Sequence, residues 1–503
     1  MDPEPSGSRE LRAAARGGAL TLVGSALSAA LGFTFGIVLA RLLGAHDSGV
    51  VVQAIAAFTI ALSIGRIGAD TCAVWILPPM VGSEPRRVRS TTALLLAMAV
   101  AGTGVLALGW WVVQRLAGTP ESSGRAAVVS AMTATAPFLP AAAVMVVALA
   151  ATRAFGGVLP FNLITNMLTP GLRVVLVVVV VLAGGGVVTV SLTWGLVWVA
   201  GAVAALAVLV RQMRAATPPG WGDRPPYREV LRFSLPRAVS SALEQSVIWF
   251  DVLLVGLIAG NGPAGVYGAA SRFVAAGIIV STAVRIVVAP RFSALLAQGR
   301  LPELRQLYSV TARWILVFGA PIYLGLAIYA PTVLSWLGPG FSSGVPAMVI
   351  LCLGSVVVLA AGNVQSLLLM SGRSSWAAVN KSIVLAFNVV GNLILIPRIG
   401  ITGAAIVWAA SMLVDTVLAA WQTHRATQVA VEVREVLRTG ALVAVSVMVP
   451  AGAVAWLLGQ GTVSLLVAAV LSVTGLLTMA YLDRDRLQLS ELRGIRGRSR
   501  QVA

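Results

Sequence analysis

Residues 44–54 read GAHDSGVVVQA, and residues 260–270 read GNGPAGVYGAA. At a constant offset of 216 the two stretches share a residue at four positions: glycine at 44 and 260, glycine at 49 and 265, valine at 50 and 266, and alanine at 54 and 270. Each stretch is a short turn that leads into an apolar segment, and each precedes a basic loop. This duplication predicts two related halves, which is a recurring design of membrane transporters.

The composition around these turns is that of a membrane protein. Of the 503 residues, 58% are hydrophobic and only 11% are charged, and the mean hydropathy is +0.91. Soluble domains carry about 25% charged residues. Runs such as 174–181 are rich in valine, but a membrane barrel needs strands of alternating polarity, and this pattern is missing from the sequence. The composition therefore predicts an all-α integral membrane protein.

The apolar segments predict about 14 transmembrane helices, because one crossing takes about 20 mostly apolar residues. The expected segments are 18–40, 49–77, 91–113, 125–149, 158–183, 187–210, 231–259, 264–289, 313–330, 344–370, 376–397, 401–423, 437–458 and 462–481. The first segment follows a polar start and is long enough to span, so it is expected to remain as a helix instead of being cleaved as a signal.

The repeat and these segments together predict six regions. They are a cytoplasmic tail at 1–17, an N-terminal six-helix lobe at 18–210, a cytoplasmic linker loop at 211–230, a C-terminal six-helix lobe at 231–423, two additional transmembrane helices at 424–481, and a basic cytoplasmic tail at 482–503.

The basic residues predict the orientation. With the N-terminus in the cytoplasm, 26 of the 36 lysines and arginines fall in cytoplasmic tails and loops, and four fall on the opposite side. Cytoplasmic loops of membrane proteins are enriched in lysine and arginine. Both termini are therefore expected in the cytoplasm. The same placement explains the net charge of +18 without a nucleic-acid partner.

Apart from four arginines within two residues of a segment end, ten charged side chains fall inside the expected helices: Arg66, Asp70, Arg173, Arg237, Glu244, Asp251, Arg272, Arg285, Lys381 and Asp415. Each costs about 2.5–3.5 kcal/mol at a helix centre, so most should face a protein interior or a water-filled cavity. Arg66 and Asp70 are four residues apart and can pair on one helix face. Arg237, Arg285 and Lys381 lie near cytoplasmic helix ends, where long side chains can reach the membrane surface. The surplus of cations favours an anionic substrate.

Several motifs of enzymes and pumps are absent from the sequence. A phosphate-binding loop needs Gly-Lys-Ser/Thr, but the single lysine, Lys381, follows Asn380. The expected outer loops contain only Asp47, Glu121 and His46 as acid–base residues. Two cysteines far apart do not form a disulfide framework or a metal site. The sequence thus predicts a protein that is not an enzyme and has no cofactor and no metal.

The chain resembles the polysaccharide-export flippases of the multidrug/oligosaccharidyl-lipid/polysaccharide superfamily. The resemblance covers residues 10–480 and rests on the order of several loose motifs, among them GIVLARLLGAHDSGV (36–50), LRFSLPRAVSSALEQSVIWFDVLLVG (231–256), GVYGAASRF (265–273) and RWILVFGAPIYLGL (313–326). It implies two six-helix lobes around a central cavity, alternating access, and a place in the bacterial cytoplasmic (inner) membrane. The implied substrate is a polyprenyl-pyrophosphate-linked oligosaccharide, and the implied partners are membrane lipid and a polysaccharide polymerase or glycosyltransferase.

The resemblance also implies site residues. The lipid II flippases of the same superfamily carry cavity arginines that fall at Arg272 and near Arg66, whereas their first-helix arginines are replaced here by residues such as Ala29 and Thr34. Lipid II is therefore not the expected substrate. We expect Arg272, Arg66 and Arg173 to bind the phosphates. The acids, which would balance charge or carry a coupling ion, are Asp70, Glu244, Asp251 and Asp415.

Three other functions remain open at this point. A cation-coupled multidrug antiporter of the same superfamily would need an acid-dominated cavity. A non-transporting scaffold for envelope synthesis would act through the basic loops and the tail at 482–503. A membrane glycosyltransferase would need a larger outer loop with carboxylates.

Overall fold

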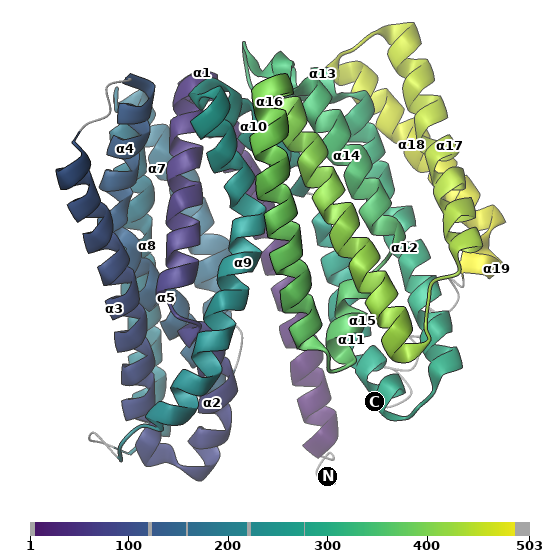
Figure 1. Cartoon of the computed structure of the whole chain (residues 1–503). Coiled ribbons are helices and arrows are strands. Elements are labelled where there is room, and N and C mark those ends of the chain that lie inside the picture. Colours follow the sequence, from purple (N-terminus) through teal and green to yellow (C-terminus); the bar gives the residue numbers. More distant parts are fainter. Residues whose placement is uncertain (1–5, 119–122, 157–158, 219–222, 276, 488–503) are drawn as a thin grey trace. The chain divides into compact units, whose positions relative to one another are not determined.

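The structure is a computed structural model that describes residues 6–118, 123–156, 159–218, 223–275 and 277–487. Every regular element in these residues is a helix (Figure 1). Most of the predicted basic tail, residues 488–503, lies outside the described residues, as do residues 1–5 and residues 219–222 of the predicted linker. The chain forms two compact units, one of residues 15–268 and one of residues 1–14 and 269–503.

The first unit contains most of α1 and continues to the start of α10. Its main helices are α1 (Ser6–Gly65), α2 (Ala69–Ser83), α3 (Pro85–Ala117), α4 (Ser123–Thr135), α5 (Leu139–Thr152), α7 (Thr169–Leu182), α8 (Val187–Ala216), α9 (Tyr227–Ala259) and α10 (Asn261–Ala275). A short helix, α6 (Leu159–Phe161), and a π-helical stretch, Asn162–Leu168, precede α7. The core is made by apolar side chains of α1, α2, α3, α5 and α8.

The second unit follows the same pattern of long helices joined by short breaks. Its helices are α11 (Ile278–Ala297), α12 (Leu301–Ile328), α13 (Ala330–Ser335), α14 (Val345–Ala360), α15 (Val364–Met370), α16 (Ser374–Thr427), α17 (Val433–Leu458), α18 (Thr462–Leu482) and α19 (Arg484–Leu487). The expected segment 344–370 is divided between α14 and α15. The division falls at Gly362, whose φ of 61° lets the chain turn against Ala312.

Twelve helices in the described residues are long and apolar enough to cross a membrane. Two of them are bent, α1 at Gly44 and α16 at Ile399 and Gly400. Their membrane-compatible parts are 43 and 53 residues long, and one crossing takes about 20 residues. The all-helical membrane fold is confirmed. Twelve helices do not establish the expected number of crossings, and fourteen stays a prediction.

The repeated turns adopt the same backbone conformation. Gly44 has φ 74° and ψ 179°, and Gly260 has φ 98° and ψ 175°. This region is accessible only to glycine, which explains why the repeat keeps glycine there. Five residues later, Gly49 lies against the backbone carbonyl of Asn261, and Gly265 lies against that of Ala45. The start of α10 thus packs directly against the part of α1 that follows Gly44. The contact leaves no room for a side chain at Gly49 or at Gly265.

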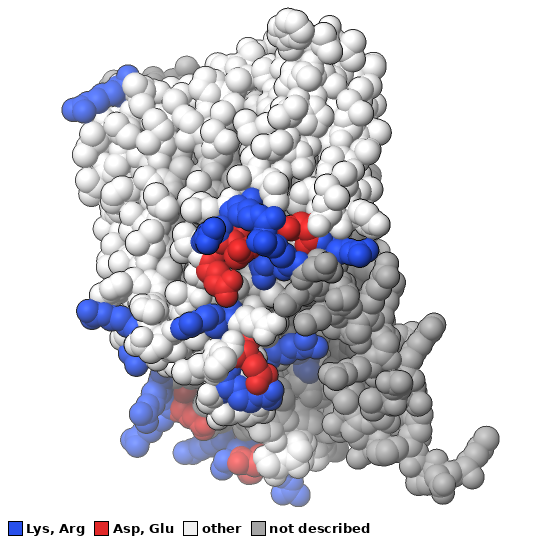
Figure 2. Space-filling view, turned by 90° about the vertical axis from the view of Figure 1, so that its right-hand side faces the viewer, with Lys and Arg blue, Asp and Glu red and all other residues white. Residues whose placement is uncertain are grey.

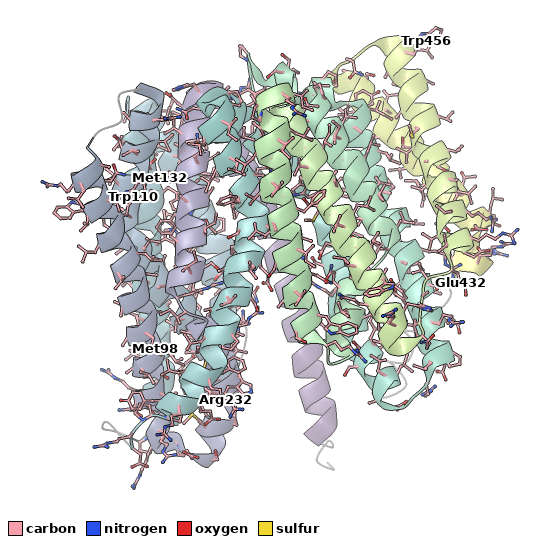
Figure 3. All side chains as sticks on the ribbon, in the orientation of Figure 1. Met98, Trp110, Met132, Arg232, Glu432 and Trp456 are labelled. Carbon is pink, nitrogen blue, oxygen red and sulfur yellow. The ribbon has the colours of Figure 1, made fainter. Side chains whose placement is uncertain are left out.

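Charged side chains gather at one end of the helix pair formed by α17 and α18. Figure 2 shows them clustered around α19 on this face, while the part above is nearly free of charge. Arg438 forms two ion pairs, from Nη2 to Asp483 Oδ1 at 3.0 Å and from Nη1 to Glu435 Oε2 at 3.9 Å. Arg486 Nη1 lies 3.5 Å from Glu435 Oε1. Trp456 projects from the opposite end of α17 (Figure 3) and is 84% exposed. An aromatic residue at one end and charges at the other are typical of a membrane-spanning helix.

Candidate functional site

The predicted pair Arg66 and Asp70 lies at a break between two helices. Arg66 Nη1 is 3.3 Å from Asp70 Oδ2, and each side chain is less than one fifth exposed. The expected continuous helix over 49–77 is wrong here, because the chain turns at Ile67 and Gly68, whose φ values are 51° and 67°. Gly68 has no side chain to hold off the backbone of α9, and the carbonyl of Ser234 approaches it closely.

Beside this break, one donor of Arg66 and one acceptor of Asp70 lack a hydrogen-bond partner among the described residues. Arg66 Nε and Asp70 Oδ1 are buried and have no hydrogen-bond partner among the described residues. Asp70 lies in the first turn of α2, where a carboxylate interacts favourably with the helix dipole. The pair can therefore accept one further polar group without giving up its own ion pair.

The polar residues of α9 divide into an exposed pair and a buried acid. Arg237 Nη1 lies 3.6 Å from Glu244 Oε1, with both side chains more than one third exposed. Asp251 is 2% exposed. It accepts hydrogen bonds from Tyr267 Oη at 2.5 Å and from the backbone N–H of Val252 at 2.8 Å. Asp251 thus joins α9 to α10, which is sufficient reason for a buried carboxyl at this position.

Arg173 is held between two tryptophans of the next helix. Its guanidinium carbon lies 4.7 Å from the ring centroid of Trp194 and 4.6 Å from that of Trp198. Phe58 of α1 packs on both tryptophan rings, at centroid distances of 5.0 and 5.8 Å. Stacking on aromatic faces stabilises a cation without neutralising it.

Three hydrogen-bond donors of this cluster have no acceptor among the described residues. Arg173 Nε, Arg173 Nη2 and Trp198 Nε1 are buried without a hydrogen-bond acceptor in the described part of the chain. Guanidinium donors are suited to phosphate and carboxylate oxygens. Three unused donors around one fixed positive charge make this a candidate anion site.

Asp415 belongs to an ion pair within the second unit. Lys381 Nζ lies 2.5 Å from Asp415 Oδ2, which also accepts a hydrogen bond from Gln365 Nε2 at 2.8 Å. The two charged residues lie on opposite sides of the bend in α16 at Gly400. The interpretation of Lys381 as a side chain that reaches the membrane surface is wrong, because its ammonium group pairs with a carboxylate that is 7% exposed.

The predicted site residues are distributed over both units. Arg66, Asp70, Arg173, Glu244 and Asp251 lie in the first unit, and Arg272 and Asp415 lie in the second. Contacts join Arg66 to Asp70 and Glu244 to Arg237, but Arg173 forms no ion pair with a described residue.

The described residues contain no group of three or more side chains suited to a metal ion. Asp483, part of an Asp-Arg-Asp triplet in the sequence, is instead the partner of Arg438.

Some residues of these clusters were missed at the level of sequence. Trp194 and Trp198 are four residues apart, so their spacing places them on one face of α8, but a pair of tryptophans in an apolar helix suggests only packing. Gln53 donates through Nε2 to Asn261 Oδ1 at 3.0 Å, beside the crossing of Gly49 and Gly265. No local spacing relates these two residues, which are 208 positions apart.

Comparisons with known proteins agree with this architecture. Residues 38–346 match the sequence model of the family described as "Polysaccharide biosynthesis protein". Two relatives from Haloferax volcanii are the probable low-salt glycan biosynthesis flippase Agl15, 27% identical over 198 residues, and the probable flippase AglR, 26% identical over 188 residues. These alignments cover 38% and 36% of the chain and 41% and 39% of the relatives, so the chain spans about two fifths of the length of each.

Solved structures share the fold at low sequence identity. A lipid II flippase MurJ in an inward closed conformation superposes with a TM-score of 0.72 at 10% identity, covering 92% of this chain and 99% of the other. An inward-facing multidrug resistance MATE family transporter of the MOP superfamily gives 0.65 at 14% identity, covering 80% and 95%. A MOP superfamily transporter from Pyrococcus furiosus, whose title reports reversed polarity of the binding pocket, gives 0.58 at 14% identity, covering 87% and 99%. Both transporters and flippases therefore use this fold.

Proposed function

Because the chain belongs to the polysaccharide biosynthesis protein family, we propose that it is a flippase for a saccharide linked to a polyprenyl pyrophosphate. It moves this lipid-linked unit across the cytoplasmic membrane by alternating access, for the synthesis of cell-surface polysaccharide. Both termini lie in the cytoplasm in this proposal, which the distribution of basic residues supports. A polymerase or glycosyltransferase would act on the same lipid-linked substrate.

The observation that carries the proposal is the unused cationic donor set at Arg173. Its Nε and Nη2 are buried and find no acceptor among the residues that the structure describes, and the same holds for Trp198 Nε1. Burying donors without acceptors costs free energy, and a phosphate oxygen that arrives with the substrate would recover it. In this proposal Arg173 binds the pyrophosphate, Arg272 and Arg66 are further phosphate-binding residues, and the lipid tail stays in the bilayer.

The acidic residues distinguish this function from cation-coupled drug export. Three of the four predicted acids have a cationic partner: Asp70 pairs with Arg66, Glu244 with Arg237, and Asp415 with Lys381. The fourth, Asp251, accepts a hydrogen bond from the neutral hydroxyl of Tyr267 and is 2% exposed. A site that captures cations needs carboxylates with spare negative charge. These partners favour the role of charge balance over that of a drug or cation site, although Asp70 Oδ1 and Asp415 Oδ1 remain available to a coupling ion.

The proposal is tested by deleting the gene in its native cell and measuring lipid-linked saccharide in the membrane. We expect accumulation of a polyprenyl-linked saccharide that wild-type protein clears. Arg173→Gln keeps hydrogen-bonding ability but removes the charge, and should clear it poorly. The matched control is Arg115→Gln, because Arg115 also stacks on a tryptophan, Trp111 at 4.6 Å, but at the exposed end of α3.

The outcomes separate the function from its site. No accumulation in the deletion strain would overturn the flippase proposal. Accumulation that wild type and Arg173→Gln clear equally well would support the function but remove Arg173 from the site. Loss of clearance in the Arg115→Gln control as well would show that removal of any stacked arginine damages the protein.

A further inference from the structure

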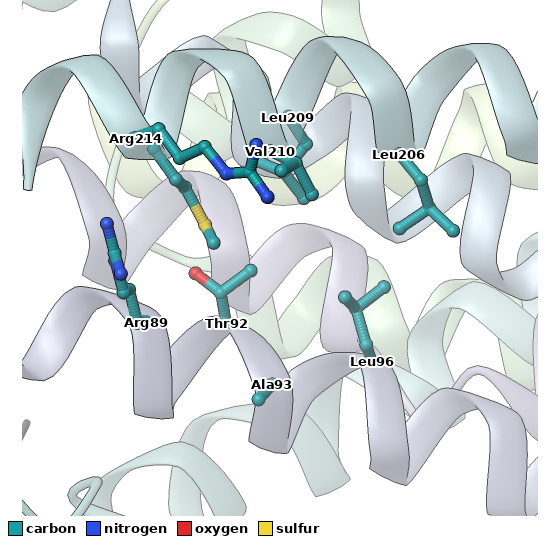
Figure 4. Close-up of a pocket in the computed structure, with 9 residues that line it drawn as sticks. Arg89, Thr92, Ala93, Leu96, Leu206, Leu209, Val210 and Arg214 are labelled. Atoms are coloured by element: carbon teal, nitrogen blue, oxygen red, sulfur yellow. The ribbon is translucent and has the colours of Figure 1, made fainter. Parts of the chain in front are cut away.

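A groove runs between α3 and α8 in the first unit, away from the charged clusters described above. Its cavity volume is about 430 Å³, which is within the range of small-molecule sites. Figure 4 shows its walls, with Leu96 of α3 and Leu206 of α8 at one end of the groove. Leu209 and Val210 continue the apolar wall on α8. This part of the groove suits a hydrocarbon chain.

The other end of the groove is basic. Arg89 and Arg214 extend from the two helices at the same end (Figure 4). Arg89 donates from Nε to Thr217 Oγ1 at 2.9 Å and from Nη2 to the carbonyl of Thr217 at 3.3 Å, which fixes its guanidinium. Arg214 is exposed and has no ion pair with a described residue. The lining includes two arginines and no acid.

The position of the basic end indicates the kind of ligand. Arg89 lies near the start of α3 and Arg214 near the end of α8. The sequence assigns them to the basic stretch 78–90 between two expected helices and to the linker 211–230, both of which we predict to be cytoplasmic. Basic pockets between transmembrane helices on the cytoplasmic side bind anionic lipid headgroups. A groove with two arginines at one end and an apolar wall along the rest therefore complements one phospholipid. The phosphate would lie at the arginines and the acyl chain along the leucines.

We propose that the groove between α3 and α8 binds an anionic phospholipid of the cytoplasmic leaflet, with its phosphate on Arg89 and Arg214. The absence of an acid from the lining favours a headgroup with net negative charge over a zwitterionic one, because nothing in the lining would pair with an ammonium group. The apolar wall favours a lipid over free phosphate.

The test measures binding of dioleoyl phosphatidylglycerol and dioleoyl phosphatidylcholine to the purified full-length protein in detergent, by native mass spectrometry and by the lipid-dependent shift in Tm. We expect wild type to retain phosphatidylglycerol preferentially. Loss of both arginines in Arg89→Gln/Arg214→Gln should weaken that binding roughly 30-fold, as expected for two basic groups near a membrane surface. The matched control is Arg86→Gln/Arg211→Gln, which removes exposed arginines from the same two helices outside the groove.

Two further variants keep the proposal testable if the double variant folds poorly. Arg214→Gln alone removes a side chain that forms no ion pair with described residues, and should weaken binding several-fold. Ala93→Phe fills the apolar wall without changing the charge and should displace the acyl chain.

Three results would overturn the proposal. The first is unchanged phosphatidylglycerol binding in both groove variants. The second is an equal loss in the control pair, which would mean that the whole basic surface attracts the lipid. The third is displacement of phosphatidylglycerol by a tenfold lower concentration of a polyprenyl phosphate, which would assign the groove to the isoprenoid carrier. Clearance of lipid-linked saccharide does not depend on any of these results, so the two proposals fail separately.

Discussion

The crossing of α1 and α10 gives the most direct stability prediction, through Gly49→Ala. The new Cβ would lie 2.8 Å from the backbone nitrogen of Gly265 and closer still to the carbonyl oxygen of Asn261. Ordinary carbon–oxygen contacts lie at about 3.3–3.6 Å. Since both contacts are to backbone, no side-chain rotation can relieve them, and the two helices would have to separate.

The magnitude follows from two losses and one gain. Overpacking costs about 1–3 kcal/mol, and loosening the hydrogen bond from Gln53 to Asn261, 3.0 Å long, costs about 0.5–1.5 kcal/mol. Alanine in place of a helical glycine returns about 0.5–1 kcal/mol. The three terms together span about 0.5–4 kcal/mol, and we expect Gly49→Ala to lower the free energy of unfolding by about 2 kcal/mol.

The assay is unfolding of the purified protein in mixed micelles with increasing sodium dodecyl sulfate. The control is Gly32→Ala in the same helix, where a Cβ meets nothing within 4 Å, and stability should stay equal or rise slightly. Gly265→Ala should cost a similar amount to Gly49→Ala, and the double variant should cost less than the sum, because the first separation makes room for the second methyl group. If Gly49→Ala is as stable as Gly32→Ala, α1 and α10 do not pack closely enough at Gly49 and Gly265 to exclude a methyl group.

Two buried polar contacts give further predictions with the same assay. Lys381→Met leaves the carboxylate of Asp415 without its cation and should cost about 3 kcal/mol, whereas Lys381→Met/Asp415→Leu should recover most of it; equal losses in both would argue against the pair. Tyr267→Phe removes only the hydroxyl that donates to Asp251 and should cost about 1.5–3 kcal/mol. A Tyr267→Phe protein as stable as wild type would show that the carboxyl of Asp251 does not need this bond.

Local patterns in the sequence predicted what depends on short spacing. Continuous apolar segments predicted the helices, and the four-residue spacing of Arg66 and Asp70 predicted their ion pair. Hydropathy could not reveal the turn at Ile67 and Gly68, because both residues fit an apolar helix and only the approach of α9 explains the break. Hydrophobic length likewise could not locate the break after Ala360.

Contacts between distant residues were outside the reach of these patterns. Lys381 is 34 residues from Asp415, on the other side of a bend, so its position near a helix end suggested exposure to the membrane surface. Arg173 was recognised as an unusual intramembrane charge, but its stacking on Trp194 and Trp198 depends on how α7 packs against α8. The roles of all these residues in transport stay predictions.

The placement of Arg173 also has a consequence for how the chain enters the membrane during synthesis. The membrane-compatible span that carries it, Leu159–Leu182, contains 15 valines, leucines, isoleucines and phenylalanines, which together favour insertion by about 4.5–9 kcal/mol, while the arginine opposes it by about 2.5–3.5 kcal/mol. Proline and glycine in the first turn of α7 make insertion less favourable still. The arginine therefore offsets a substantial part of the free energy that would insert this span by itself. Its aromatic partners are supplied by α8, only a few residues later, so α7 and α8 should enter the bilayer together as a hairpin.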